Sequence, residues 1–227
     1  MNTIHKDVTD LIYEFRAELQ RIIKNKFYGL YLYNSVAMGN FEPESSDIDF
    51  IVVLNDTLGD VEIDDLSILH NKLIDKHVHG LKLDGMYLQQ DMIVKMNNNI
   101  ETYPYVKKWN LFKEGYFDIN YITWWSLKEL EMAIDSPSIK DRLEEIEFKD
   151  IINTMRYNLN QYWLPKLEDK EIFKEDMWVE FGVLTLSRII YTLKEGGIIS
   201  KKEACEFILK DSAEWNDIVE EALAIRK

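Results

Sequence analysis

The chain has 227 residues, of which 46% are hydrophobic and 30% are charged, as in an ordinary globular protein. Its net charge of −14 disfavours nucleic acid as the main partner, because binding phosphates requires a basic surface. The longest apolar runs are too short to cross a bilayer, no secretory signal is visible, and one cysteine excludes an internal disulfide framework. We therefore expect a cytoplasmic protein without a membrane association, whose acidity serves solubility or attracts a cationic small molecule.

The first hundred residues predict a mixed α/β module. Apolar residues at helical spacing predict a helix over residues 7–25, and the aromatic-rich YGLYLY predicts a strand over 28–33. Two further strands are expected over 47–54 and 81–89, with a helix over 63–77 between them. The stretch that separates the first two strands is predicted to be a loop.

Strand signals vanish beyond about residue 118, and helical patterns take over at 119–134, 148–164, 174–195, 201–210 and 214–226. Ser200 followed by Glu203 predicts a capping box, and Gly196-Gly197 predicts the end of the preceding helix. We predict an α+β fold in two domains. The first, over 1–100, has a mixed β-sheet with flanking helices, and the second, over 101–227, is all-helical.

Two aspartates stand one residue apart at the start of a strand that otherwise looks buried. Asp47 and Asp49 project to the same face of that strand, because alternate strand residues share a face. Their paired oxygens suit Mg²⁺, and two such ions, about 3.5–4 Å apart, can hold the attacking and leaving oxygens of a nucleotidyl displacement. The alternative is a turn-rich start of a strand in which aspartate is chosen for its local hydrogen bonds.

A third acid and a hydroxyl complete the candidate site. Asp84 lies among apolar residues in LKLDGMYL, and it joins the other two acids if this strand pairs with the strand over 47–54. It could then hold a metal ion and accept the proton of an attacking hydroxyl. Upstream, Ser35 lies in a loop where Gly39 permits close backbone approach, so that this loop can cradle phosphate oxygens.

The pattern N-S-x-x-x-G followed by S-D-I-D-F-I-V-V, over residues 34–53, resembles the signature of the DNA polymerase beta-like nucleotidyltransferases. The run LTLSR over 184–188, Tyr191, and GGIISKKEA over 196–204 are similar to the C-terminal domain of aminoglycoside adenylyltransferases. That family transfers AMP from ATP to a hydroxyl of spectinomycin or streptomycin. The resemblance covers most of the chain and is loosest over about 90–150.

The resemblance implies a role for each matching residue. Asp47 and Asp49 would bind Mg²⁺, and Asp84 would be the catalytic base, where the family usually has glutamate. Ser35 would contact the triphosphate together with Asn34, which replaces the signature glycine. Asparagine tolerates a left-handed backbone better than other non-glycine residues, so the turn can form, although its side chain could crowd the phosphates.

The helical half would supply the remaining contacts to the two substrates. The resemblance implies that Arg188 and Lys201 reach the nucleotide phosphates from a domain that closes the active-site cleft. Without it, the two are an ordinary helix-surface charge and a solvated residue after a cap. Trp109, Asp176 and Glu180 lie in regions suited to holding a cationic acceptor.

We therefore expect a Mg²⁺-dependent adenylyltransferase that uses ATP to modify a hydroxyl of an aminoglycoside-type antibiotic, with no obligate protein partner. Two alternatives remain open from the sequence. The first is adenylylation of another small molecule or of a protein hydroxyl. The second is a nucleotide-binding sensor or antitoxin-like module without turnover, which the substitution at Asn34 favours and which the presence of all three acids disfavours.

Overall fold

The computed structural model describes residues 5–226 and divides into two compact units, Met1–Glu147 and Phe148–Lys227. The predicted boundary between residues 100 and 101 is therefore wrong. The reason is that residues 105–134 add strands to the sheet of the first unit, and these strands bury apolar side chains there. The predicted fold class, a mixed sheet followed by an all-helical region, is confirmed.

The first unit is built on a six-stranded sheet with the order β5-β4-β3-β2-β1-β6. Its central strands β2 and β3 are parallel and are joined through helix α3 (Asp60–Lys76), whereas every other pair described in the sheet is antiparallel. The strands are β1 (Phe27–Leu32), β2 (Ile48–Leu54), β3 (Leu83–Gln89), β4 (Tyr105–Lys107), β5 (Asn110–Phe112) and β6 (Met132–Ile134).

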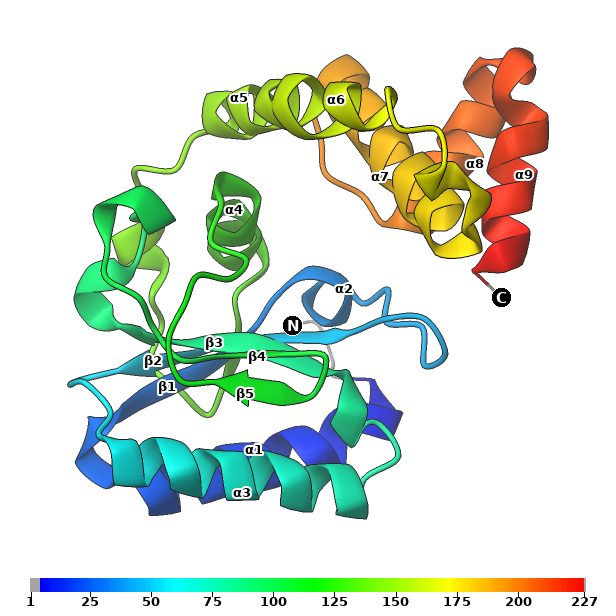
Figure 1. Ribbon diagram of the computed structural model, residues 1–227. Helices are drawn as coiled ribbons and strands as arrows, with labels where there is room; N and C mark the ends of the chain where they lie inside the picture. The colour runs from blue at the N-terminus through cyan, green and yellow to red at the C-terminus, as the bar shows by residue number, and fades with distance from the viewer. Residues whose placement is uncertain (1–4, 227) are drawn as a thin grey trace. The chain divides into compact units, whose positions relative to one another are not determined.

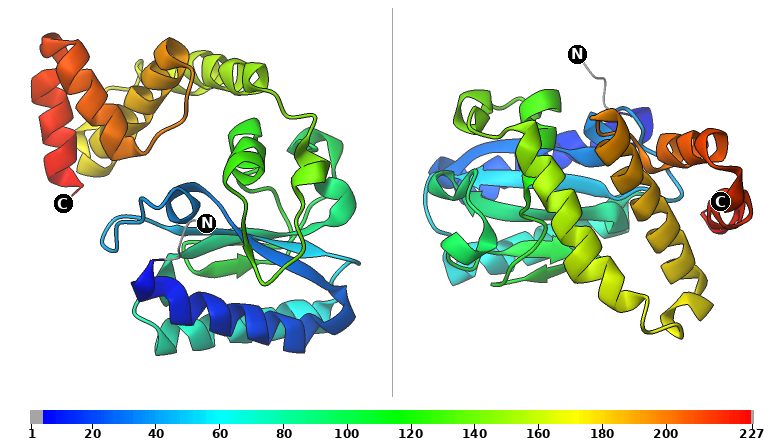
Figure 2. Two further views of the ribbon diagram at one scale, coloured as in Figure 1. Left: turned by 180° about the vertical axis from the view of Figure 1, so that it is seen from behind. Right: turned by 90° about the horizontal axis from the view of Figure 1, so that it is seen from above.

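Helices cover both faces of this sheet. Helix α1 (Lys6–Ile23) and α3 lie along one face, and α4 (Tyr121–Leu130) lies on the other, as Figures 1 and 2 show from opposite sides. The side chains of Phe50 and Val52 join the core beneath α1 and α3, whereas those of Ile51 and Val53 join the core on the α4 side. A central strand buried on both faces reads as a continuous apolar run, which is the pattern that β2 shows.

Three strands and one helix end differ from the sequence-based expectation. Strands β4, β5 and β6 are three residues long each, too short to give a periodic signal. The helix predicted over 119–134 ends at Leu130, and Met132–Ile134 then pairs with β1. Pairing with an existing sheet, rather than local propensity, sets the conformation of these residues.

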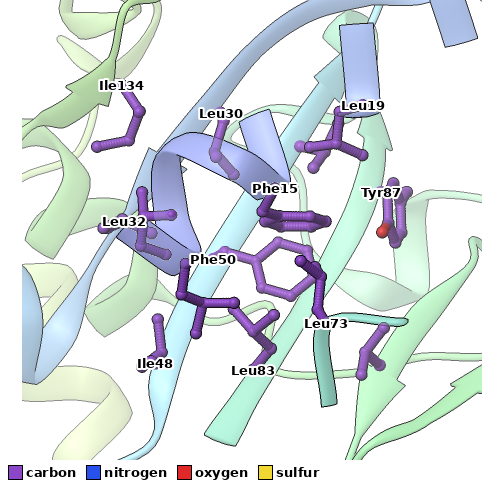
Figure 3. Close-up of a cluster of buried hydrophobic side chains, with 14 of the residues drawn as sticks. Phe15, Leu19, Leu30, Leu32, Ile48, Phe50, Leu73, Leu83, Tyr87 and Ile134 are labelled. Atoms are coloured by element: carbon purple, nitrogen blue, oxygen red, sulfur yellow. The ribbon is translucent and has the colours of Figure 1, made fainter. Parts of the chain in front are cut away.

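A buried histidine lies within the core that α1 and α3 form with the sheet. Nε2 of His70 is 2.7 Å from the Tyr87 hydroxyl oxygen, and its ring packs against Phe15 and Phe50. Figure 3 shows Phe15, Phe50 and Tyr87 gathered at this point. Burial lowers the pKa of His70 from 6.5 to about 4, because the charged ring would be separated from water.

We expect His70 to make the stability of the protein depend on pH. The unfolded chain binds a proton at this residue near pH 6.5, and the folded chain does so only near pH 4. Neutral His70 therefore makes its full contribution to the free energy of unfolding above pH 6.5. That contribution decreases as the pH falls from 6.5 to about 4, by up to about 3 kcal/mol. Urea unfolding of the wild type and His70→Gln across this range should show the difference between them shrinking, whereas parallel pH profiles would contradict this assignment.

Over its described residues, the second unit contains helices joined by turns and loops, and no strand. Ser200 Oγ accepts the Glu203 N–H at 3.2 Å and Gly196 has φ 75°, so the predicted capping box and helix end are both confirmed. Buried Leu184, Cys205, Ile208 and Val219 form a core between the last three helices. The helices are α5 (Phe148–Tyr157), a π-helical segment (Asn158–Trp163), α6 (Leu164–Lys166), α7 (Asp176–Glu195), α8 (Lys201–Asp211) and α9 (Asn216–Ile225), with short 3-10 helices at Ile172–Lys174 and Ala213–Trp215.

Within residues 5–226, none of the helices has both the length and the apolar composition that crossing a bilayer requires.

Candidate active site

Two of the predicted acids lie opposite each other on the parallel strands. Asp49 is the second residue of β2 and Asp84 is the second residue of β3, and the register pairs them directly. Paired residues of neighbouring strands project to the same face of a sheet, here the face that α4 covers. Asp47 is exposed and precedes Asp49 by two residues at the start of β2. The structure therefore brings Asp49 and Asp84 together, and the charge of Asp47 is close enough to raise the pKa of both.

The environment of Asp49 favours its protonated form. Burial raises the pKa of Asp49 well above its ordinary value, and the nearby charges of Asp118, Asp47 and Asp84 raise it further. A hydrogen bond from the Asn34 side chain has the opposite effect. The carboxylates thus form a region of concentrated negative charge, in which a divalent cation would be strongly attracted.

The surroundings of Asp84 bring its pKa closer to neutrality. Burial raises its pKa to about 6, the charge of Asp47 adds to this increase, and the hydrogen bond from Lys108 opposes it. The Lys108 backbone N–H donates to Asp84 Oδ1 at 2.8 Å. A carboxylate that titrates near pH 6 is ionised at neutral pH and yet basic enough to accept a proton during a reaction.

The three acids do not form a ready-made metal site. In the part of the chain that the structure describes, no group of three or more histidine, cysteine, aspartate or glutamate side chains is arranged to hold a metal ion. Asp84 directs Oδ1 toward the Lys108 N–H, and the charges of Asp47, Asp84 and Asp118 raise the pKa of Asp49. The donor set still fits Mg²⁺ chemically, because all of its ligands are hard carboxylate oxygens.

The predicted phosphate loop is a short helical turn, α2 (Asn34–Ala37), directly after β1. Asn34 has φ 52°, so it adopts the left-handed backbone expected where the family has glycine. Its side chain hydrogen-bonds to Asp49. Ser35 Oγ donates to the carbonyl of Asp47 at 3.2 Å and so connects this turn to the first acid.

Sequence reasoning missed a fourth acid, Asp118, which precedes α4. Its Oδ2 accepts a 3.4 Å hydrogen bond from the hydroxyl of buried Tyr33, and its Oδ1 accepts one from Asn120 at 3.1 Å. Its charge is the strongest of those that raise the pKa of Asp49. The sequence signals only that Asn120 caps a helix, and the proximity of Asp118 to Asp49 depends on how α4 packs on the sheet.

The other predicted residues divide between the two units. Trp109 is half-exposed at the tip of the β4–β5 hairpin, next to Lys108. Arg188 is half-buried on α7, and the ammonium of Lys201 lies 5.8 Å from the centre of the Phe181 ring. Asp176 is exposed in the first turn of α7, whereas Glu180 accepts a 2.9 Å hydrogen bond from Arg226.

Comparison with known proteins gives matches to both halves of the chain. Residues 142–227 match the family model described as aminoglycoside adenylyltransferase, C-terminal domain. The spectinomycin 9-adenylyltransferase of Enterococcus faecalis is 22% identical over 226 residues, which cover 93% of this chain and 84% of that protein. The crystal structure of the spectinomycin adenyltransferase from the same organism, determined with ATP and spectinomycin, matches with a TM-score of 0.69 and 19% identity. That match covers 95% of this chain and 89% of the solved one.

The chain is thus similar to nucleotidyltransferases in its C-terminal region, in its sequence as a whole and in its fold. Among nucleotidyltransferases it resembles the aminoglycoside adenylyltransferases, and the resemblance predicted from the sequence is thereby confirmed.

Proposed function

We propose that this protein transfers AMP from ATP to a hydroxyl of an aminoglycoside-type antibiotic and releases pyrophosphate. The observation that carries the proposal is the pairing of Asp49 with Asp84, whose pKa is raised to about 6. This arrangement places a carboxylate suited to proton transfer beside carboxylates suited to a divalent cation. The relatives named for spectinomycin support an antibiotic of this class as the acceptor.

The chemical step requires a base near the acceptor. The oxygen of the acceptor hydroxyl attacks the α-phosphorus of ATP, its proton passes to the carboxylate of Asp84, and the bond to pyrophosphate breaks. Asp47 and Asp49, together with Asp84, would hold Mg²⁺. When bound there, Mg²⁺ supplies positive charge that stabilises the phosphate oxygens as the displacement proceeds.

Other residues would bind the substrates. The α2 turn with Ser35 and Asn34 would contact the triphosphate, and Arg188 and Lys201 of the second unit would bind phosphate oxygens. For a cationic acceptor, Trp109 offers an exposed ring and Asp176 an exposed carboxylate. Glu180 is a weaker candidate, because Arg226 already neutralises part of its charge.

The test is an acceptor panel. The protein is incubated with ATP, MgCl₂ and, in turn, spectinomycin, streptomycin and further aminoglycosides, and pyrophosphate release is measured together with the mass of each drug. We expect an AMP adduct and stoichiometric pyrophosphate with at least one drug, and neither product when MgCl₂ is replaced by EDTA.

Asp84→Asn serves as the matched control, because it removes the base and preserves the shape of the side chain. ATP binding by calorimetry with no adduct on any drug would contradict the proposal, and it would favour a binding module instead. An adduct only on a non-antibiotic hydroxyl would retain the chemistry and replace the acceptor.

A further inference from the structure

The tip of the β4–β5 hairpin contacts Asp84 in a way that the sequence does not indicate. Lys107 pairs with Asn110 in the ladder, so Lys108 and Trp109 form a two-residue loop. The Lys108 N–H is not used in the ladder, and it donates instead to Asp84 Oδ1 at 2.8 Å. The contact joins residues 24 positions apart and comes from the backbone, so no particular side chain is required at Lys108.

The loop adopts an unfavourable conformation at both of its residues. Lys108 has φ 46° and Trp109 has φ 61°, which is the left-handed region that asparagine and glycine normally occupy in such hairpins. Neither lysine nor tryptophan is suited to this conformation. Strain of this kind persists only where the surrounding structure enforces it, and it is concentrated at functional sites.

Aromatic stacking holds the two strands of the hairpin in place. The Tyr105 ring stacks on that of Phe112 at 4.8 Å and on that of Phe117 at 5.5 Å. At the tip, Asn110 Nδ2 donates to the Lys108 carbonyl at 3.0 Å. These contacts fix the position from which the Lys108 N–H reaches Asp84.

We propose that the hairpin tip is a positioning element for the base of the proposed reaction, on whose function this inference rests. The Lys108 N–H holds Oδ1 of Asp84, which keeps a second lone pair for Mg²⁺, and Oδ2 is left to accept the proton of the acceptor hydroxyl. A shorter acid than the family's usual glutamate has one rotatable bond fewer, and the hydrogen bond removes much of the freedom that is left. Lys108 is thus a positioning residue that acts through its backbone.

Two substitutions of Lys108 distinguish the role of its backbone N–H from that of its side chain. Lys108→Gly and Lys108→Val both remove the charge, but only glycine accepts the left-handed backbone readily. We expect Lys108→Gly to keep kcat within about twofold of the wild type, since the N–H stays in place. Lys108→Val should lower kcat about 10- to 100-fold while the KM for ATP changes by less than about threefold.

A second measurement does not need turnover. Hydrogen exchange by NMR should show a protected amide at residue 108 in the wild type and in Asp84→Asn, which keeps an oxygen acceptor, and exchange at least about tenfold faster in Asp84→Ala. Equal kcat values for the two Lys108 variants would overturn the inference, as would an unprotected amide in an active wild-type protein. A wild type that transfers no AMP despite a protected amide overturns the proposed function and, with it, the catalytic role of the contact.

Discussion

Replacing Asp49 with asparagine is expected to lower AMP transfer about 1,000-fold, equivalent to about 4 kcal/mol of transition-state stabilisation, while making the folded protein more stable. The two effects have a common cause. Burial and the charges of Asp118, Asp47 and Asp84 disfavour the ionised form of Asp49 in the folded state, so a neutral amide of the same size removes that penalty. The same change removes a charged ligand for the proposed cation. Steady-state kinetics and urea unfolding on one preparation measure both effects.

Asp91→Asn is the matched control, because Asp91 is exposed and forms only a 3.7 Å ion pair with Lys95. It should leave both activity and stability within experimental error of the wild type. An Asp49→Asn protein that keeps a third or more of the wild-type rate would refute the assignment of Asp49 to the site. A loss of stability in that variant would refute the proposed repulsion between the acids.

Gly85→Ala is expected to destabilise the first unit by more than about 3 kcal/mol and to lower its Tm by about 10 °C. Gly85 pairs with Phe50 across the parallel strands. A Cβ at this position would lie 2.6 Å from Cγ and Cδ1 of the Phe50 ring and closer still to the Phe50 carbonyl oxygen. Relief requires the two strands to separate, which also moves Asp84 away from Asp49. The Tm measured by calorimetry and the rate of AMP transfer should therefore decrease together.

Gly59→Ala provides the comparison within the same unit. A Cβ at Gly59 would meet only the Glu62 carboxylate, at an ordinary 3.7 Å, so the cost should stay below about 1 kcal/mol. Equal melting temperatures for the two variants would show that the close approach of Phe50 to Gly85 does not constrain the sheet.

The sequence predicts the long elements of the fold well. α3 and β2 lie within three residues of their predicted bounds, because each carries a strong apolar pattern that tertiary packing reinforces. β6 was missed because MAI is too short to show a period and becomes a strand only by pairing with β1. The domain boundary was misplaced for the same reason, since unrecognised strands were assigned to the helical half.

The residues of the candidate site divide in the same way: local geometry places some of them, and tertiary packing places the others. Asp47, Asp49 and Asp84 could be found because local strand geometry sets the face to which each acid projects. Asp118 and the Lys108 N–H could not be found, because they reach the acids through the packing of α4 and through a strained turn. Every residue except proline has a backbone N–H, so the residue type does not show which N–H contacts a carboxylate.

The parallel pairing of β2 with β3 has a practical consequence. Asp49 and Asp84 both stand at the amino ends of their strands, so the carboxyl ends lie about 17 Å away, five residues further along each strand. The exposed turn at Asp56 follows that remote edge, and Cys205, the one thiol of the chain, is buried. An Asp56→Cys protein would therefore accept a maleimide dye at a single place, giving a fluorescent reporter well removed from the catalytic acids.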